Sequence, residues 1–282
     1  MDENLLRQHQ LERLAPFLEK YQLPAVGFSL SPDLGEGRSG SSKLGGVPDL
    51  PSGVEWPVYK ERPLDFLLQV DLAEASPFEK AGLLPKDGLL TFFYNLDEQF
   101  ADFVPADLNG FCVLYTAADD FVSAHSIPNE KFRLPERFLQ YRSVDTIPWF
   151  RTLLMDELKQ DSQMTEDERD HYWNYYAAFE GGQNVETSHR LLGHPQNVQG
   201  DMQLDAELIM SGAYPKNIPY FNFPDKDEIA ARAHDWVLLL ELDTDDSADL
   251  MWGDAGMLYY WIRKQDLARC DFSKVWMTLQ CH

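Results

Sequence analysis

The chain has 282 residues, and 47 aspartates and glutamates against 24 lysines and arginines give it a formal net charge of −23. Nucleic-acid recognition draws most of its affinity from clustered cations, so this excess of acid argues against a nucleic-acid partner. Hydrophobic residues make up 44% and charged residues 25% of the chain, which excludes a disordered protein and predicts a packed core. The length corresponds to two ordinary domains or one large one.

The start of the chain and its cysteines indicate the compartment. The first four residues carry acids and no base, so they do not fit a signal peptide. The most apolar stretches end at Gln69 and Glu241, far short of the ~18 residues that a membrane-spanning helix needs. Cys112, Cys270 and Cys281 are odd in number and lack C-x-x-C spacing, which favours free thiols in a reducing environment. We therefore expect a cytoplasmic protein without membrane contact, cofactor or metal.

The first part of the chain predicts a helix followed by strands. Apolar residues at helical spacing predict an amphipathic helix over residues 3–21, closed by Pro24, and then a strand over residues 25–30. Residues 31–42 are rich in glycine, serine, proline and charge, and predict a loop. Apolar runs bounded by glycine and proline then predict three strands, over residues 65–72, 88–94 and 110–116.

A helical insert is predicted over residues 149–182. A helix over residues 150–160 precedes a second one, for which Thr165 and Glu168 form a capping box. The second helix has an aromatic face, which we interpret as packing against a sheet rather than as a ligand-binding box. Its members are Tyr172, Trp173, Tyr175, Tyr176 and Phe179. A further helix is predicted over residues 225–233.

The last part of the chain repeats the order of the earlier strands. Strands predicted over residues 236–242, 256–262 and 274–281 match the first three, and a Gly-x-Pro precedes each set, at Gly46 and Gly193. Four elements in one order predict an internal duplication. We expect an α+β fold of two related β-rich halves in a single bilobal domain over residues 1–282. It comprises an N-terminal helix and strand (1–30), a first repeat (43–116), the helical insert and a second repeat (189–282).

Five short motifs together resemble a bacterial family. They are SKLGGVPDLP at residues 42–51, FLLQVD at 66–71, HRLLGHP at 189–195, QGD at 199–201 and MWGDAG at 251–256. As a set they resemble the YwqG-like proteins, a family known as a domain of unknown function. The resemblance covers nearly the whole chain and implies an α+β fold of two related β-rich halves. It also implies a distant similarity to the programmed-cell-death-2 and Tsr4 proteins, which escort a ribosomal protein.

Two polar residues interrupt apolar strands at equivalent places. Gln69 lies within the first predicted strand of one half, and Glu241 lies within its counterpart in the other half. An unpaired polar group in a buried strand costs about 1–3 kcal/mol, so each should have a hydrogen-bond partner, for example in the Gly-x-Pro corner. The alternative is that both residues line a groove between the halves, and the two interpretations can coexist.

The other candidate binding residues lie in predicted turns and loops. Trp56 precedes a proline and Trp252 precedes a glycine, so both are expected in loops. Such a tryptophan either packs into the core or serves as an anchor for a partner. The acids between Asp243 and Asp254 are spaced like the oxygen ligands of a calcium loop, but Ala248 stands where such a loop needs glycine. A solvated acidic turn is therefore favoured, and cation binding is left open. The set is completed by His189, Gln199, Asp201, Asp243 and Asp254.

Two classes of function remain. The excess negative charge speeds encounter with cationic partners, which predicts a non-enzymatic intracellular protein that engages a basic protein partner through a groove between the halves. The alternative is a metal-assisted hydrolase or RNA-processing enzyme in which Asp201, Asp254 and His189 transfer protons. Such groups work only when they converge and their pKa is tuned, which the sequence does not indicate. The binding protein is therefore the favoured hypothesis.

Overall fold

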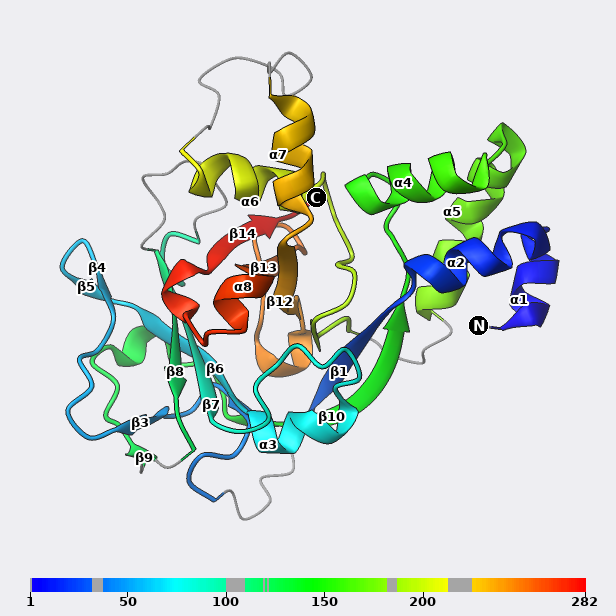
Figure 1. The fold of residues 1–282 in the computed structure, drawn as a ribbon. Helices are drawn as coiled ribbons and strands as arrows, with labels where there is room; N and C mark the ends of the chain where they lie inside the picture. Colours follow the sequence, from blue (N-terminus) through cyan, green and yellow to red (C-terminus); the bar gives the residue numbers. More distant parts are fainter. Residues whose placement is uncertain are drawn as a thin grey trace.

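The computed structural model describes residues 2–31, 38–99, 110–118, 120, 122–181, 187–212 and 225–282. Within these residues ten strands form one antiparallel sheet, in the order β14-β13-β12-β11-β1-β10-β2-β6-β7-β8. Helices lie around this sheet (Figure 1). The predicted α+β class is therefore confirmed.

The predicted strands at both ends of the sheet agree with the observed ones to within two residues. The strands of the large sheet are β1 (Leu23–Ser31), β2 (Lys43–Leu44), β6 (Asp65–Asp71), β7 (Leu89–Tyr94), β8 (Phe111–Thr116), β10 (Arg137–Thr146), β11 (Arg190–Leu191), β12 (Trp236–Asp243), β13 (Met257–Arg263) and β14 (Trp276–Gln280). Two small sheets pair β3 (Asp49–Pro51) with β9 (Val122–Ala124), and β4 (Val58–Tyr59) with β5 (Arg62–Pro63).

The helices of the described residues surround the sheet. They are α1 (Glu3–Gln8), α2 (Ala15–Tyr21), α3 (Leu72–Ala75), α4 (Leu153–Ser162), α5 (Glu166–Gly181), α6 (Met202–Met210), α7 (Lys226–Ala233) and α8 (Lys264–Leu267). Short 3-10 turns occur at Glu12–Leu14, Ser76–Phe78, Glu130–Phe132, Asp246–Ala248 and Phe272–Lys274. Among the described helices, none combines the length and the apolar character that crossing a lipid bilayer requires.

The prediction of one continuous N-terminal helix is wrong. Gln10 adopts a φ of 55°, in the left-handed region, and separates α1 from a 3-10 turn that leads into α2. A residue in this conformation ends the helical hydrogen-bond ladder. The apolar stripe still reaches the core, because Leu6, Leu11 and Leu14 are buried on both sides of the break. Apolar spacing therefore identified the buried face but not the interruption.

The pair β1 and β10 forms the centre of the sheet. These strands are antiparallel from Leu23 opposite Thr146 to Ser31 opposite Phe138. β10 was not among the predicted strands, because polar and charged residues recur along it and it has no apolar run. The short strands β2 and β11 flank this pair and connect it to the two ends of the sheet. Of the two central strands, β1 was thus predicted from the sequence, over residues 25–30, and β10 was not.

The sheet curls so that its two ends face each other across one core. Phe92 of β7 and Tyr260 of β13 meet edge to face, with ring centroids 5.2 Å apart. Tyr94 and Trp252 make a similar contact at 6.3 Å, and the Tyr260 hydroxyl donates to the carbonyl of Phe93 at 3.3 Å. Burying one large apolar side chain is worth about 1.5–3 kcal/mol. This shared core therefore holds the two ends together.

Different elements cover the outer face at each end of the sheet. At the β6–β8 end, the small sheets place Leu50 and Tyr59 against Phe66 and Phe93. At the β12–β14 end, α6 lies beside the sheet (Figure 1), and its apolar residues pack on a layer of aromatic side chains. That layer consists of Trp236, Tyr259, Trp261 and Trp276. Strands β6, β7, β12 and β13 are thus buried on both faces, which explains the apolar runs that predicted them.

The helical insert packs against the N-terminal helices on one side of the molecule (Figure 1). The predicted capping box begins α5: the Glu168 amide donates to Thr165 Oγ1 at 3.2 Å, and the Thr165 amide donates to Glu168 Oε2 at 2.9 Å. Tyr172 and Tyr175 of the aromatic face are buried, but against other helices and not against a sheet. Trp173 differs, because 51% of its surface is exposed.

The two ends of the sheet share a local backbone geometry. β6 and β12 each contain a register shift relative to the next strand. After β2 the chain turns through Gly45 and Gly46, with φ angles of 61° and 71°. After β11 it turns through Leu192 and Gly193, with φ angles of 61° and 77°. These are the Gly-x-Pro corners identified in the sequence, and they have the same left-handed conformation.

Candidate functional site

Gln69 is fully buried and satisfied by the corner that follows β2. Its Oε1 accepts from the Asp49 amide at 2.8 Å, and its Nε2 donates to Asp49 Oδ2 and to the Ser41 carbonyl, each at 2.8 Å. The Lys43 ammonium lies 3.3 Å from the same Asp49 carboxylate. The expected hydrogen-bond partner is therefore present. Gln69 has no exposed surface and lines none of the described pockets.

Glu241, the predicted counterpart of Gln69, lies in β12 and is fully buried. Arg190 Nε lies 3.2 Å from its Oε1, Ser188 Oγ donates to Oε1 at 2.7 Å, and the Gln196 amide donates to Oε2 at 2.7 Å. Burial raises the pKa of Glu241 to about 7, against the lowering effects of Arg190, Ser188 and Gln196. Arg190 also lies 3.0 Å from Glu180 Oε2. Gln196 directly follows Pro195, so this buried network fixes the second corner.

His189 joins the Asp243–Asp254 turn to the sheet. Its Nδ1 accepts from the Asp243 amide at 3.0 Å, and its Nε2 lies 3.3 Å from Asp245 Oδ2. Because Nδ1 accepts, the ring proton lies on Nε2 and is donated to Asp245. The ring also stacks on Phe28, with centroids 5.3 Å apart. Trp252 is buried beside it and donates from Nε1 to the Asp243 carbonyl at 3.0 Å.

Replacing Asp245 by asparagine should destabilise the protein most above pH 4. The bond from His189 lowers the pKa of Asp245 to about 2. A carboxyl with a lowered pKa contributes stability above its unfolded pKa, and this contribution is lost as the pH falls through the folded pKa. We expect a loss of about 1–2 kcal/mol at pH 6, shrinking toward pH 2. Urea unfolding at both pH values measures it. The exposed neighbour Asp246→Asn is the control, and an equal loss there would contradict the assignment.

The remaining candidates act at separate places. Asp201 caps α6, because its Oδ1 accepts from the amides of Gln203 at 2.9 Å and Leu204 at 3.3 Å, and its Oδ2 accepts from Leu153 at 2.6 Å. Burial raises the pKa of Asp201. Gln199 Nε2 donates to the Cys281 carbonyl at 2.8 Å. These contacts tie the loop before α6 to its surroundings.

Trp56 and Asp254 complete the set. Trp56 Nε1 donates to the Leu64 carbonyl at 2.8 Å, and its ring packs on Phe93 with centroids 5.2 Å apart. Asp254 is exposed, and its backbone carbonyl accepts from His282 at 3.2 Å. The structure therefore brings together His189, Glu241, Asp243 and Trp252, and leaves the other candidates apart. In the described part of the chain, no group of three or more His, Cys, Asp or Glu residues is placed to hold a metal ion.

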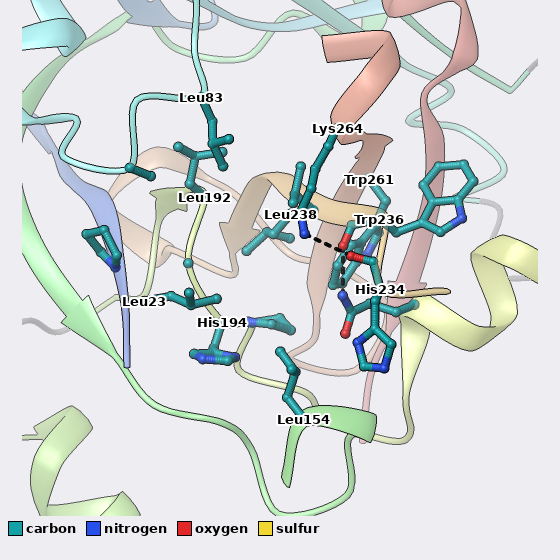
Figure 2. Close-up of a pocket in the computed structure, with 16 residues that line it drawn as sticks. Leu23, Leu83, Leu154, Leu192, His194, His234, Trp236, Leu238, Trp261 and Lys264 are labelled. Carbon is teal, nitrogen blue, oxygen red and sulfur yellow. Dashed lines mark hydrogen bonds between the residues drawn. The ribbon is translucent and has the colours of Figure 1, made fainter. Parts of the chain in front are cut away.

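A cavity of about 210 Å³ lies at the β12 end of the sheet and contains none of the nine candidate residues in its lining. Figure 2 shows Leu23, Leu83 and Leu192 on one side of it, and Trp236, Trp261 and His234 on the other, with Leu154 below. These side chains come from β1, the β6–β7 connection, the corner after β11, the C-terminal end of α7, β12, β13 and α4. The cavity is therefore formed jointly by segments from both ends of the sheet and by the insert.

Three polar side chains of this cavity are held by the backbone. Gln203 Nε2 donates to the Trp236 carbonyl at 2.7 Å, and Lys264 Nζ donates to the His234 carbonyl at 3.0 Å (Figure 2). His194 Nε2 donates to the Tyr21 carbonyl at 2.7 Å. Burial lowers the pKa of His194 to about 4, so the ring is neutral at pH 7. The cavity thus offers a mainly apolar wall with fixed polar groups at its edges.

One buried donor in the cavity wall is unsatisfied. The indole Nε1 of Trp261 has no hydrogen-bond partner among the described residues, although this side chain is only 2% exposed. Buried donors are normally paired, and an unpaired one costs about 1–3 kcal/mol. The sequence did not indicate this site, because its walls come from segments far apart in the chain. The one available signal was the Gly193-x-Pro195 corner, interpreted only as a rigid turn.

The fold and this cavity define an α+β protein whose two sheet ends enclose one core and share one small apolar site. The chain belongs to the family described as a domain of unknown function, DUF1963, whose profile matches residues 42–281. No curated protein matches the chain. The family match covers the sheet from β2 to β14 and includes most of the cavity lining, but not Leu23 and Pro24 of β1.

Proposed function

We propose that the chain is a binding protein that engages a basic protein partner, and that the cavity of Figure 2 receives one apolar side chain of that partner. The observation that carries this proposal is the joint lining of the cavity by both halves. Its volume of about 210 Å³ is smaller than the ~300–1,000 Å³ of pockets for drug-sized ligands. A single leucine or aromatic side chain is an anchor of suitable size, and such anchors carry most of the binding energy in protein interfaces.

The charge of the chain supports a cationic partner. A formal charge of −23 attracts positively charged proteins over several ångströms and repels polyanions. Next to the cavity, Glu157 Oε1 lies 3.0 Å from His234 Nε2, and 46% of the Glu157 side chain is exposed. A lysine or arginine beside the apolar anchor would meet this carboxylate. The resemblance to the Tsr4 proteins, which escort a ribosomal protein, supports the same class of partner.

The buried network around Glu241 holds the corner whose residues line the cavity. Glu241 holds the amide of Gln196, and Arg190 donates to the His194 carbonyl at 3.2 Å. His194 and its neighbour Pro195 line the cavity. We therefore assign Glu241 and Arg190 a positioning role, in which they hold one wall in place.

We also propose that the two halves arose by duplication of one β-rich unit. Support comes from equivalent contacts: β2 pairs Lys43 with Gln69, and β11 pairs Arg190 with Glu241. In addition, the amide of Asp71 donates to Ser42 Oγ at 2.9 Å, just as the amide of Asp243 donates to His189 Nδ1 at 3.0 Å. The YwqG-like resemblance implies the same two-part design.

Metal-assisted hydrolysis gains no comparable support. Asp201 already accepts three backbone amides, His189 has both ring nitrogens engaged, and Asp254 is exposed in a different turn. General acid–base catalysis requires such groups to reach one substrate atom. The geometry therefore favours binding over this chemistry.

Binding of a defined peptide tests the proposal. A lysine-rich peptide with one central leucine should bind the chain, and replacing that leucine by serine should weaken binding about tenfold. Ala81→Trp, which fills the cavity mouth from an exposed position, should cause a similar loss. Fluorescence anisotropy of the labelled peptide at low and high salt measures these affinities.

The matched control is Val58→Trp, which adds the same side chain at a site that is 60% exposed and outside the cavity. It should leave peptide affinity unchanged. If the leucine and serine peptides bind equally, or if Ala81→Trp binds like the wild type, the cavity does not receive the leucine. The interaction would then come from general charge attraction alone. No binding of either peptide at low salt would refute the proposal.

A further inference from the structure

A second cleft, of about 450 Å³, lies between the helical insert and the loop before α6. Its walls come from the connection between β10 and α4, from α5, and from the residues just before Gly200. The lining residues are Trp149, Phe150, Arg151, Arg169, Asp170, Trp173, Val198 and Gln199. Unlike the cavity of Figure 2, this cleft falls within the ~300–1,000 Å³ typical of small-molecule sites.

Aromatic rings form one wall of this cleft. Phe150 and Trp173 meet edge to face, with centroids 6.0 Å apart at 83°. Trp173 is 51% exposed, although its neighbours Tyr172 and Tyr175 on α5 are fully buried. A half-exposed tryptophan beside a phenylalanine leaves a flat apolar surface in contact with water. Such a surface favours a flat ring that can stack on it.

Two arginines stand beside these rings. Arg151 is exposed. Within the described part of the chain, the contacts of Arg169 are long, from Nε to the Thr165 carbonyl at 3.4 Å and from Nη2 to Glu166 Oε1 at 4.0 Å. Of the described lining residues, Asp170 is the only acid. The two arginines outnumber this acid, so the lining carries a small positive excess on a molecule whose formal charge is −23.

We propose that this cleft binds a small aromatic acid. The flat ring stacks on Trp173 and meets Phe150 edge to face, because the two side-chain rings stand at 83° to each other. The anionic group pairs with the guanidinium groups of Arg151 and Arg169. Planar guanidinium groups match the geometry of a carboxylate and can donate two parallel hydrogen bonds to it. The ring supplies apolar burial, and the arginines supply the preference for an anion. This site is separate from the cavity of Figure 2, so the proposal stands independently of the proposed function.

Calorimetric titration of the full chain with three probes tests this site. 1-Naphthoate, a flat ring with a carboxylate, should bind with a one-to-one stoichiometry and a dissociation constant below about 1 mM. The neutral 1-naphthylmethanol should bind about tenfold more weakly, because it lacks the charge that the arginines recognise. Acetate, which has the charge without the ring, should give no measurable heat.

Variants then assign the binding to the cleft. Arg151→Gln combined with Arg169→Gln should bring 1-naphthoate to the affinity of the neutral probe, and Trp173→Ala should weaken both aromatic probes about tenfold. Arg269→Gln is the matched control, because its side chain is 68% exposed and lies outside the cleft. Circular dichroism confirms that each variant is folded. Equal affinity for the acid and the alcohol, or wild-type binding by the arginine and tryptophan variants, would overturn the proposal.

Discussion

Replacing Arg190 by methionine should lower the free energy of unfolding by about 3–5 kcal/mol at pH 8. Arg190 is buried, and its guanidinium lies 3.2 Å from Glu241 and 3.0 Å from Glu180, whose side chain is only 9% exposed. Methionine fills most of the space but leaves two carboxylates without a counter-ion. An unpaired buried charge costs far more than the pair contributes. Urea unfolding followed by tryptophan fluorescence measures the loss.

The loss should shrink as the pH falls from 8 to 5. Burial raises the pKa of Glu241 in the folded protein to about 7. Ionisation of Glu241 therefore lowers the free energy of unfolding as the pH rises from the pKa of the unfolded chain to about 7. Without Arg190 the pKa of Glu241 should rise further, and protonation at pH 5 removes the unpaired charge. An equal loss at both pH values would contradict this electrostatic origin.

A second substitution provides the control for the same prediction. Arg190→Met combined with Glu241→Gln removes both charges of the pair, and should recover part of the stability lost by Arg190→Met alone at pH 8. Under the proposed duplication the counterpart of Glu241 is Gln69, which pairs with Lys43 of β2. Additive losses in the double variant would show that packing, and not the unpaired carboxylate, sets the effect.

The parts of the fold that the sequence predicted are those with strong local signals. β6 and β12 are buried on both faces, so their sequences are apolar runs that predict strands. The capping box of α5 is recognised from two residues that are three positions apart, Thr165 and Glu168. The polar interruptions at Gln69 and Glu241 also gave a correct prediction, because each accepts a backbone hydrogen bond from the residue after its Gly-x-Pro corner. Local chemistry was sufficient for these features.

Other features depend on contacts between distant segments. β10 has polar residues along its length and is stabilised as the neighbour of β1, so its own pattern did not reveal it. The spacing within the two predicted repeats also differs, which weakened the evidence for a duplication in the sequence. Glu241 follows Gly193 by 48 residues, whereas Gln69 follows Gly46 by 23. The longer spacing accommodates α6 and α7, whereas the described residues between Gly46 and β6 form no α-helix.

The candidate residues and the observed cavity differ for a related reason. Polar residues in apolar strands stand out in a sequence, but Gln69 and Glu241 are fully buried and occupied by internal bonds. Five leucines and two tryptophans are among the residues that line the cavity of Figure 2, and in a sequence they look like ordinary core residues. Two predicted residues do lie near a hollow: Gln199 lines the arginine-containing cleft, and Asp201 holds the amide of Leu153 beside the cavity.

Gly45→Ala should be one of the most destabilising single substitutions in the chain, with a loss of about 3 kcal/mol. A Cβ at this position would lie 2.6 Å from the carbonyl oxygen of Leu134 and closer still to that of Pro135. The backbone cannot shift away easily, because the Gly45 amide donates to Leu67 at 2.7 Å. Relieving the clash would therefore require β2 to move away from the segment that leads into β10, with which it pairs.

The left-handed conformation of Gly45 contributes only a small part of this loss. Leu192 has the same φ of 61° at the matching corner and carries a full side chain there. Gly53→Ala measures the effect of the left-handed backbone alone, because Gly53 has a φ of 84° and nothing lies within 4 Å of an added Cβ. This substitution should lower the free energy of unfolding by about 1 kcal/mol. Thermal unfolding of both variants measures the difference. Equal losses would mean that backbone strain alone, and not the contact with Leu134 and Pro135, requires glycine at the first corner.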